Sequence, residues 1–267
     1  MTTDEQSKIA EQFAYARQTT LALADFPGVA PTTLDDAYVI QDVAIDQWPD
    51  SVAGWKVGKI PDHLEEGMGC DRLAGPIFKS LIHHDTAEQL TMPVYDRGFA
   101  AIEAEYLAVM GSDAEADKLD WTLDEALAMM SDLRIGIEIA SSPLANINDY
   151  GPTVVVSDFG NNAGLIVGPS ISDWRTRDTA TMGCESFIND DSVGTGGAFT
   201  LVGGFLRSVQ FMLETAAKRG RPMKAGDIIA TGQTNGIHEV QPGQSVRVSF
   251  GSDGELACEI AAASPAG

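Results

Sequence analysis

A chain of 267 residues is long enough to bury a substantial core, in one large domain or in a modest domain with a smaller one. Its 39 acidic residues outnumber the 17 basic ones, and the formal charge of -22 opposes nucleic acid and anionic membranes as partners. The 3 cysteines include no CxxC pair, and no apolar run has the character of a signal peptide or membrane span, so we expect a soluble cytoplasmic protein without disulfides or structural zinc.

The first third of the chain is predicted to begin with two helices. Apolar residues repeat at helical spacing over residues 4–24, and a second helical segment follows from Thr32 with a threonine as its cap. The run VAGWKVGKI then has the composition of a short strand flanked by glycines. Residues 61–78 are punctuated by proline and glycine, and we interpret them as connector and loop.

From about Met92 the pattern changes to short apolar runs that are typical of strands. Two helical segments, from Trp121 and from Phe205, interrupt these runs. We therefore expect an α+β protein with a helical N-terminal region and a β-rich body. The expected strands are FAAIEAEYLAVM, LRIGIEIA, TVVVSDF, AGLIVG, DIIATG, SVRVSF and ELACEIAAA.

Three glutamates are the main candidates for a functional site. Glu103 and Glu105 alternate within one predicted strand, so both carboxylates leave the same face, and Glu138 lies inside the apolar run IGIEIA. Such carboxylates repel one another unless a cation lies between them, and oxygen ligands suit magnesium, manganese or calcium. Alternating glutamates are also typical of the solvated face of a half-buried strand. The spacing leaves both interpretations open, while the apolar neighbours add weight to the metal site.

Two further features could carry chemistry. Lys56 lies in the mostly apolar run AGWKVGKI, where its ammonium either reaches solvent or meets anions as a substrate-binding or proton-transfer group. His63 and Glu66 are spaced so that a helical turn would bring them together as an acid–base pair. An exposed amphipathic turn is the simpler explanation of that pair.

Polar side chains also gather in two predicted turns. One turn offers Asp158, Asn161 and Asn162, and another offers Thr231. Turn chemistry explains both without any ligand. Amides, hydroxyls and loop N–H groups at strand ends are also the groups that a small carboxylate would use.

Several short motifs follow one another along residues 35–251. They are GWKVG, DRLAGPIF, EAEYLAVM, IEIASS, SDFGNNAGLIVG and AGDIIATG with a later PGQ. In this joint order they resemble the fumarylacetoacetate hydrolase superfamily, and within it the 2-keto-4-pentenoate hydratase and 4-oxalocrotonate decarboxylase branch. The resemblance implies a helical N-terminal region and lid in residues 1–90 and a catalytic mixed β-sandwich roll in residues 91–267. Homo-oligomers, at least dimers, are usual in this family.

The resemblance also implies roles for individual residues. Glutamates would hold a magnesium or manganese ion, a lysine would face the bound substrate, an acidic residue would assist proton transfer, and polar turn residues would bind a small anionic 2-oxo or 2-hydroxy acid. In this chain they are Glu103, Glu105 and Glu138 for the metal, Lys56 and Asp71 for catalysis, and Asn161, Asn162 and Thr231 for the substrate.

The chain departs from the family pattern at three places that we expect to touch the substrate pocket. Ala74 stands where many hydratases have a second aspartate, and Phe159 replaces an amide side chain in DFGNNAG. Residues 202–204, with the sequence VGG, replace a Gly-Asn/Asp-Pro element. The resemblance therefore indicates the metal site more specifically than the substrate.

The implied reaction is the addition of water to a 2-hydroxy-2,4-dienoate, which gives a 4-hydroxy-2-oxo acid in aromatic catabolism. A 2-oxo-3-hexenedioate decarboxylase uses the same metal and enolate, and a second basic residue in the pocket would favour it. An acylpyruvate hydrolase would use His63 with Glu66 to activate water. A metal-stabilised protein without activity is the alternative from another class, and Lys56 beside three potential ligands argues against it.

Overall fold

The larger of two β-sheets carries the strand that contains two of the glutamates. The computed structural model describes residues 1–86 and 88–265. The strands of this sheet are β1 (Val52–Lys59), β2 (Arg72–Phe78), β3 (Ile82–His84), β5 (Phe99–Met110), β6 (Met130–Ser142), β7 (Asn162–Ser170), β10 (Ile228–Ala230) and β11 (Ile237–Glu239). They follow the order β2, β1, β10, β5, β6, β7, β3, and β11 pairs with β5 beside this path. The pairs β1–β10 and β3–β7 are parallel and the other pairs antiparallel, so the sheet is mixed.

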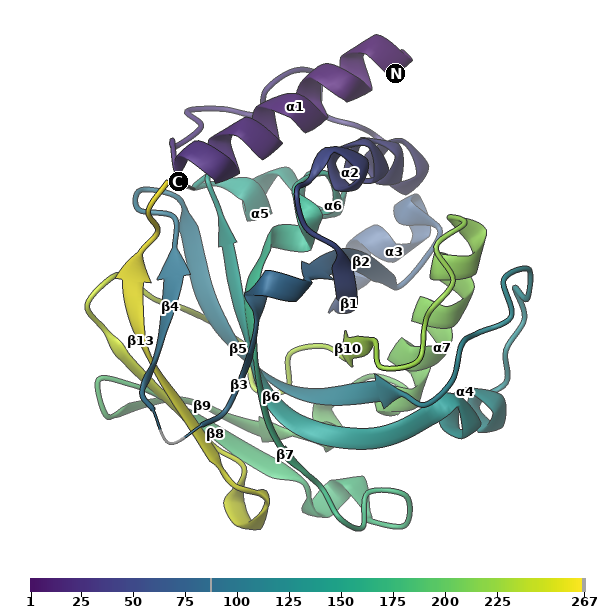
Figure 1. Ribbon diagram of the computed structural model, residues 1–267, viewed down its shortest axis with the longest axis vertical. Coiled ribbons are helices and arrows are strands. Elements are labelled where there is room, and N and C mark those ends of the chain that lie inside the picture. The colour runs from purple at the N-terminus through teal and green to yellow at the C-terminus, as the bar shows by residue number, and fades with distance from the viewer. Residues whose placement is uncertain (87, 266–267) are drawn as a thin grey trace.

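The smaller sheet has five strands and packs against the larger one (Figure 1). Its strands are β4 (Leu90–Val94), β8 (Gly183–Ile188), β9 (Asp191–Gly197), β12 (Ser245–Ser249) and β13 (Glu255–Ala262). They follow the order β4, β13, β12, β8, β9. Tyr106 of β5 and Phe250, directly after β12, meet edge to face with ring centroids 5.6 Å apart. Such aromatic contacts join the two sheets through one apolar core.

Seven α-helices are assigned in the described residues. They are α1 (Thr3–Thr19), α2 (Leu34–Gln47), α3 (Asp62–Met68), α4 (Leu123–Met129), α5 (Ile147–Tyr150), α6 (Pro152–Ser157) and α7 (Gly204–Lys218). One of them, α7, packs across β2, β1, β10 and β5 of the larger sheet. In Figure 1, α1 and α2 lie together at the top, while α4 and α7 lie together at the right. None of the helices in residues 1–86 and 88–265 combines the length and apolar character that a membrane crossing requires.

The α+β fold expected from the sequence is confirmed, and so are most of its elements. The second helix begins after Thr33, whose hydroxyl accepts a hydrogen bond from the N–H of Asp36 as a cap. The strand β5 coincides with the run FAAIEAEYLAVM. The domain boundary at residue 90 stays a prediction, and strands from both sides of it hydrogen-bond within the larger sheet.

Two predictions of secondary structure are wrong. Residues 61–78 are not loop, because they form α3 and the fully buried strand β2. Pro76 is tolerated in β2 because this strand lies at the edge of the sheet, where the missing N–H costs no ladder bond. Residues 153–157 form part of helix α6 and not a strand, with Pro152 in its first turn. Every residue of α6 is buried, so the valine run has no polar face from which a helical period could be recognised.

Candidate functional site

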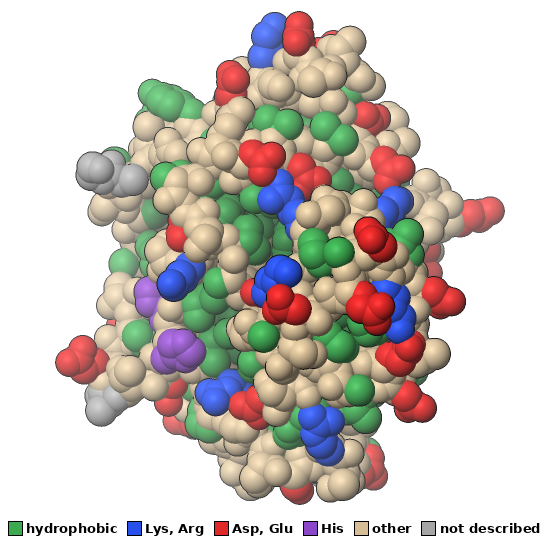
Figure 2. All heavy atoms as spheres, turned by 45° about the vertical axis from the view of Figure 1, so that its right-hand side comes forward, with side chains coloured by type: hydrophobic (Ala, Val, Ile, Leu, Met, Phe, Trp, Pro, Cys, Tyr) green, Lys and Arg blue, Asp and Glu red, His purple; other side chains and the backbone are tan. Residues whose placement is uncertain are grey.

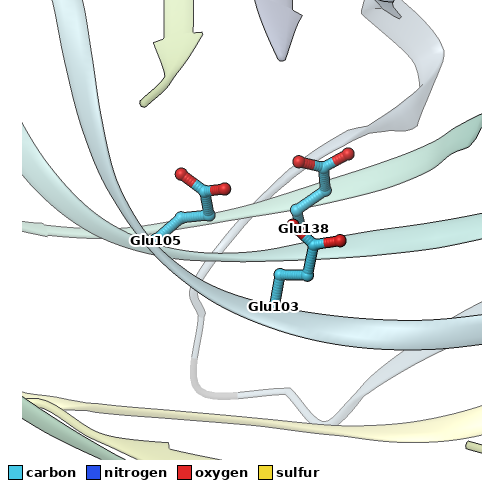
Figure 3. A group of neighbouring side chains, drawn as sticks. All are labelled: Glu103, Glu105 and Glu138. Carbon is cyan, nitrogen blue, oxygen red and sulfur yellow. The ribbon is translucent and has the colours of Figure 1, made fainter. Parts of the chain in front are cut away.

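The three predicted glutamates meet on one face of the larger sheet. Glu103 and Glu105 alternate along β5, and Glu138 of β6 is the direct antiparallel partner of Glu103. Figure 3 shows the three side chains leaving the sheet on the same side. One carboxylate oxygen from each lies within 4.8 Å of the others, and the residues are only 4%, 0% and 0% exposed. The solvated strand face, which the spacing had left open, is therefore excluded.

A single ammonium group lies among these carboxylates and offsets only part of their charge. Nζ of Lys56 lies 3.5 Å from Oε1 of Glu138, and the same oxygen accepts a hydrogen bond of 3.1 Å from Nδ2 of Asn162. Oε2 of Glu105 accepts a hydrogen bond of 2.7 Å from the N–H of Gly232. Within the described residues, Oε1 of Glu105 and Oε2 of Glu138 have no hydrogen-bond partner. Each of these two acids thus keeps one oxygen unsatisfied.

Burial and mutual repulsion perturb the protonation of this cluster. Burial, the charge of Glu138 and then that of Glu103 hold the pKa of Glu105 well above its usual range. The pKa of Glu138 is also raised, chiefly by burial, although Lys56 opposes the shift. Burial disfavours the Lys56 ammonium, but the surrounding carboxylates, Glu138 first, outweigh it and raise the pKa of Lys56. Lys56 therefore stays protonated, while Glu105 and Glu138 hold a proton more readily than ordinary carboxyl groups as long as no further cation offsets their charge.

The cluster fits a hard divalent cation. Its donors are carboxylate oxygens, which suit magnesium, manganese or calcium, and two of them are buried without a partner. Three carboxylates with one ammonium leave an excess of two negative charges, which a divalent ion would neutralise. Glu103, Glu105 and Glu138 are thus the residues that could hold it.

The turn after α6 reaches Lys56 because two glycines allow the backbones to approach. A Cβ on Gly75 of β2 would lie 2.2 Å from the carbonyl oxygen of Phe159, and one on Gly160 would lie 3.1 Å from Cδ of Lys56. Phe159, Gly160 and Asn161 have φ angles of 54°, 64° and 57°, a left-handed run that only surrounding contacts can hold in place. Oδ1 of Asn161 accordingly accepts a hydrogen bond of 3.3 Å from Nζ of Lys56.

Arg17 of α1, which sequence reasoning missed, contacts both ends of this turn, at Asp158 and at Asn162. Its Nε donates to Oδ1 of Asp158 at 2.5 Å, and its Nη1 donates to the carbonyl of Asn162 at 2.9 Å. Its guanidinium also lies over the rings of Tyr95 and Phe159. Asp158, predicted only as a turn residue, is therefore the partner of a buried cation. A single arginine in a helical segment carries no sequence signal of this role.

Thr231 lies at the end of β10 beside the glutamates. Its hydroxyl donates a hydrogen bond of 2.7 Å to the carbonyl of Tyr106, and its own carbonyl accepts one of 2.6 Å from Ser208. The same segment places the N–H of Gly232 on Glu105. Thr231 thus anchors the segment and also lines the adjoining cavity.

A cavity of about 700 Å³ opens beside the cluster, within the range of small-molecule sites. Figure 2 shows hydrophobic side chains set back in a hollow on one face, with charged side chains around it. The lining includes Lys56, Glu103, Asn161 and Thr231, whereas Asn162 lies behind it on Glu138.

Two other candidates are placed differently. Asp71 is not part of the cavity lining, and its carboxylate contacts Nη1 of Arg72 and lies 3.9 Å from Nη2 of Arg207. His63 lines the cavity from α3, but His63 and Glu66 are exposed and no hydrogen bond joins them in the described structure. Arg72 itself lines the cavity and is only 4% exposed, and sequence reasoning missed it. A charged residue directly before the apolar run LAGPIF was the available signal.

Comparison with known proteins identifies chains that are similar to this one in sequence and in fold. No protein-family model matches the chain. A 2-keto-4-pentenoate hydratase of Paraburkholderia xenovorans (strain LB400) is 24% identical over 266 residues, which cover 97% of this chain and 96% of that protein. The solved 4-oxalocrotonate decarboxylase from Pseudomonas putida G7, in complex with magnesium and adipate, has a TM-score of 0.81 at 22% identity and covers 97% of this chain and 98% of its own.

A more distant solved structure shares the fold. The fumarylpyruvate hydrolase from Pseudomonas aeruginosa, in complex with Mn2+ and pyruvate, has a TM-score of 0.54 at 14% identity, with 82% of this chain and 94% of that chain covered. The two-sheet fold is therefore shared with these solved structures, and the full-length sequence likeness is to proteins named 2-keto-4-pentenoate hydratase.

Proposed function

We propose that this chain is a divalent-cation-dependent hydratase that converts a 2-hydroxy-2,4-dienoate into a 4-hydroxy-2-oxo acid. The observation that carries the proposal is a buried trio of carboxylates that one ammonium offsets only in part, beside a cavity that Glu103 and Lys56 line. Full-length similarity to 2-keto-4-pentenoate hydratase supports the substrate class. A homo-oligomeric state stays a prediction.

In the proposed site, the cation and the protein side chains have different roles. Magnesium or manganese would be held by Glu103, Glu105 and Glu138. When bound, the cation would polarise the 2-oxygen of the substrate and stabilise the negative charge that develops there. Lys56 places a second positive charge at the same wall, and Asn161 orients it. An ammonium fixed in a buried site stabilises an enolate oxygen without reorganisation during the reaction.

The reaction requires proton transfers to two carbon atoms. The enol O–H loses its proton while a proton adds at the far end of the diene, which gives an enone. The hydroxyl of water then adds at C4 and a proton adds at C3, so that the product is the dienol plus one water. Asp71 stays the predicted proton-transfer group, and because its carboxylate is held by Arg72 outside the cavity lining, this role requires the pair to shift.

Decarboxylation of a 2-oxo-3-hexenedioate is the second candidate. Arg72 favours it, because a second basic residue at the cavity is what the extra carboxylate would need. The likeness in fold to 4-oxalocrotonate decarboxylase is compatible with either reaction. The hydrolase alternative lacks such support, since His63 and Glu66 form no hydrogen-bonded pair in the described residues.

A spectrophotometric screen separates these reactions. The purified protein is given 2-hydroxypenta-2,4-dienoate, 4-oxalocrotonate or an acylpyruvate, each with magnesium, with manganese or with excess chelator. We expect loss of dienol absorbance with formation of 4-hydroxy-2-oxopentanoate, and no reaction in the chelator. Full turnover of the dienol in chelator, or cleavage of the acylpyruvate alone, would overturn the proposal. Release of carbon dioxide from 4-oxalocrotonate would promote the second candidate.

A further inference from the structure

Apolar side chains form a wall of the cavity that begins beside Lys56. We propose that this apolar wall binds an uncharged hydrocarbon group at the far end of the substrate, so that the substrate class is 2-hydroxy-2,4-dienoates with an alkyl or aryl substituent at C5. This inference rests on the proposed function for the position of the 2-oxo acid end, and it adds a chemical class for the opposite end. The side chains of the apolar wall are those of Leu64, Met68 and Leu73.

The register of β1 and β2 sets Leu73 on the same face of the sheet as Lys56. Lys56 is the direct partner of Gly75 in this ladder. Two residues further along each strand, Gly58 is the partner of Leu73, and residues two apart on a strand share a face. Arg72, the neighbour of Leu73 in the chain, therefore lies on the opposite face of β2. The face that carries the ammonium is apolar at its next level.

Gly58 allows the Leu73 side chain to lie close to the ammonium, because it has no side chain of its own. A Cβ on Gly58 would lie 3.2 Å from Cδ1 of Leu73 and 3.8 Å from Nζ of Lys56, so at most 7.0 Å separates these two atoms. All three residues line the cavity. A substrate whose 2-oxygen lies at Lys56 can therefore reach Leu73 with a short hydrocarbon chain that passes over Gly58.

Helix α3 extends the apolar wall. It connects the end of β1 with the start of β2, so it lies next to Gly58 and Leu73 in the fold. Leu64 and Met68 are four residues apart on this helix and share one side of it. Both are half-buried, pack against the apolar core and line the cavity. A hydrocarbon group that covers these side chains removes apolar surface from water, which favours binding.

The basic side chains at this end of the cavity already have partners. The ammonium of Lys59 contacts two carboxylates of α3. The guanidinium of Arg72 contacts the carboxylate of Asp71 and donates to the carbonyl of Val202. An uncharged group therefore suits this end of the cavity better than the second carboxylate of a diacid, which would compete with these contacts.

The size of the cavity agrees with a substituted substrate. Its volume of about 700 Å³ lies in the range that holds drug-sized ligands. An unsubstituted five-carbon dienoate is much smaller than such a ligand, and it would leave the apolar wall in contact with water. A substituent at C5 fills this space.

Three inert 2-oxo acids test the proposal on the wild-type protein. Titration calorimetry with magnesium compares 2-oxopentanoate, 2-oxooctanoate and the diacid 2-oxoadipate, which have the same 2-oxo acid end. We expect 2-oxooctanoate to bind roughly 10- to 50-fold more tightly than 2-oxopentanoate, because each buried methylene adds about fourfold. Equal affinities of these two acids would overturn the proposal, and so would tighter binding of 2-oxoadipate than of 2-oxooctanoate.

Variants assign the preference to the apolar wall. Leu64→Ser and Leu73→Ala should each reduce the ratio of the affinities for 2-oxooctanoate and 2-oxopentanoate by about three- to tenfold, because less apolar surface is covered. Leu127→Ser is the matched control and should leave the ratio unchanged. Leu127 is also a half-buried leucine of a helix, but it is not among the described residues that line the cavity.

An unchanged ratio in both wall variants, or an equal reduction in Leu127→Ser, would contradict the assignment. If Leu73→Ala does not fold, Leu64→Ser and the wild-type comparison still decide.

The outcomes also distinguish this inference from the proposed function. Tighter binding of the longer acid, with no turnover of any dienol, would contradict the hydratase and support the apolar wall. Turnover of 2-hydroxypenta-2,4-dienoate, with equal binding of 2-oxopentanoate and 2-oxooctanoate, would support the hydratase and contradict the role of the apolar wall.

Discussion

Two buried charge clusters share one turn of this protein and differ in their balance. Arg17 and Asp158 form a pair of one positive and one negative charge, and Arg17 also donates to the carbonyls of Ser141, Asp158 and Asn162. Around Lys56, one ammonium faces the carboxylates of the metal-site candidates. The turn from Asp158 to Asn162 contacts both clusters, with Asp158 on Arg17 and Asn161 on Lys56.

The difference indicates what each cluster is for. A balanced buried pair can be satisfied by the protein alone, so the Arg17 cluster needs no ligand, although Oδ2 of Asp158 has no partner among the described residues. The Lys56 cluster would have two negative charges in excess if all three acids were ionised, and the pKa values of Glu105 and Glu138 are raised accordingly. Such a perturbed cluster is typical of a site where a ligand supplies the missing charge. Each of the following experiments unbalances or rebalances one of these clusters.

Removing the cation of the balanced cluster should have the largest effect. Arg17→Met leaves Asp158 buried without its partner, and we expect the free energy of unfolding to fall by about 3–5 kcal/mol. Urea unfolding followed by circular dichroism measures the change. The double variant Arg17→Met with Asp158→Asn should recover part of the loss, because no buried charge remains. A loss below about 1 kcal/mol in the single variant would contradict the structural role.

Removing one carboxylate of the unbalanced cluster should affect activity more than folding. Glu105→Gln keeps the size of the side chain and lowers the negative charge, so the fold should survive while cation-dependent turnover falls by about a thousandfold. Steady-state kinetics over a magnesium titration measures the loss. Glu115→Gln, at an exposed position, is the control and should behave as the wild type. Wild-type turnover by Glu105→Gln would exclude Glu105 as a ligand.

Removing the ammonium should separate cation binding from catalysis. In Lys56→Met the carboxylates have no internal positive charge, so manganese should bind more tightly while turnover falls by about a hundredfold. Titration calorimetry with manganese and initial-rate kinetics follow the two quantities on the same sample. Weaker manganese binding in Lys56→Met would mean that the lysine supports the site in some way other than by charge.

Removing the cation from the wild-type protein should abolish turnover but should lower the stability by less than the loss of Arg17 does. At a magnesium concentration ten times its dissociation constant, we expect a stabilisation of about 1.4 kcal/mol relative to chelator, and so a melting temperature higher by about 3–6 °C. Differential scanning calorimetry measures it, and Glu105→Gln should show a much smaller shift. Equal melting temperatures with and without magnesium would mean that the folded protein does not bind magnesium at the glutamate cluster.

The local sequence was sufficient for part of this site. Strand alternation placed Glu103 and Glu105 on one face, because side chains of a strand alternate whatever its neighbours are. The apolar neighbours of Glu138 predicted a buried position, which the structure confirms. Prolines and glycines misled the prediction at β2, where Gly75 serves close approach of another backbone and Pro76 occupies an edge position.

The remaining features depend on contacts between distant parts of the chain. The register of β5 and β6 sets Glu138 opposite Glu103, and a shift of one residue would turn it to the other face. Arg17 meets Asp158 across 141 residues, and Arg72 meets the carbonyl of Val202 across 130. Local sequence patterns predict which residues are buried and how side chains alternate. Strand register, ion pairing and the cavity arise only when the elements pack together. The sequence by itself therefore determined the acids and the strand that presents two of them, and the tertiary structure decided which charges are satisfied and which remain for a ligand.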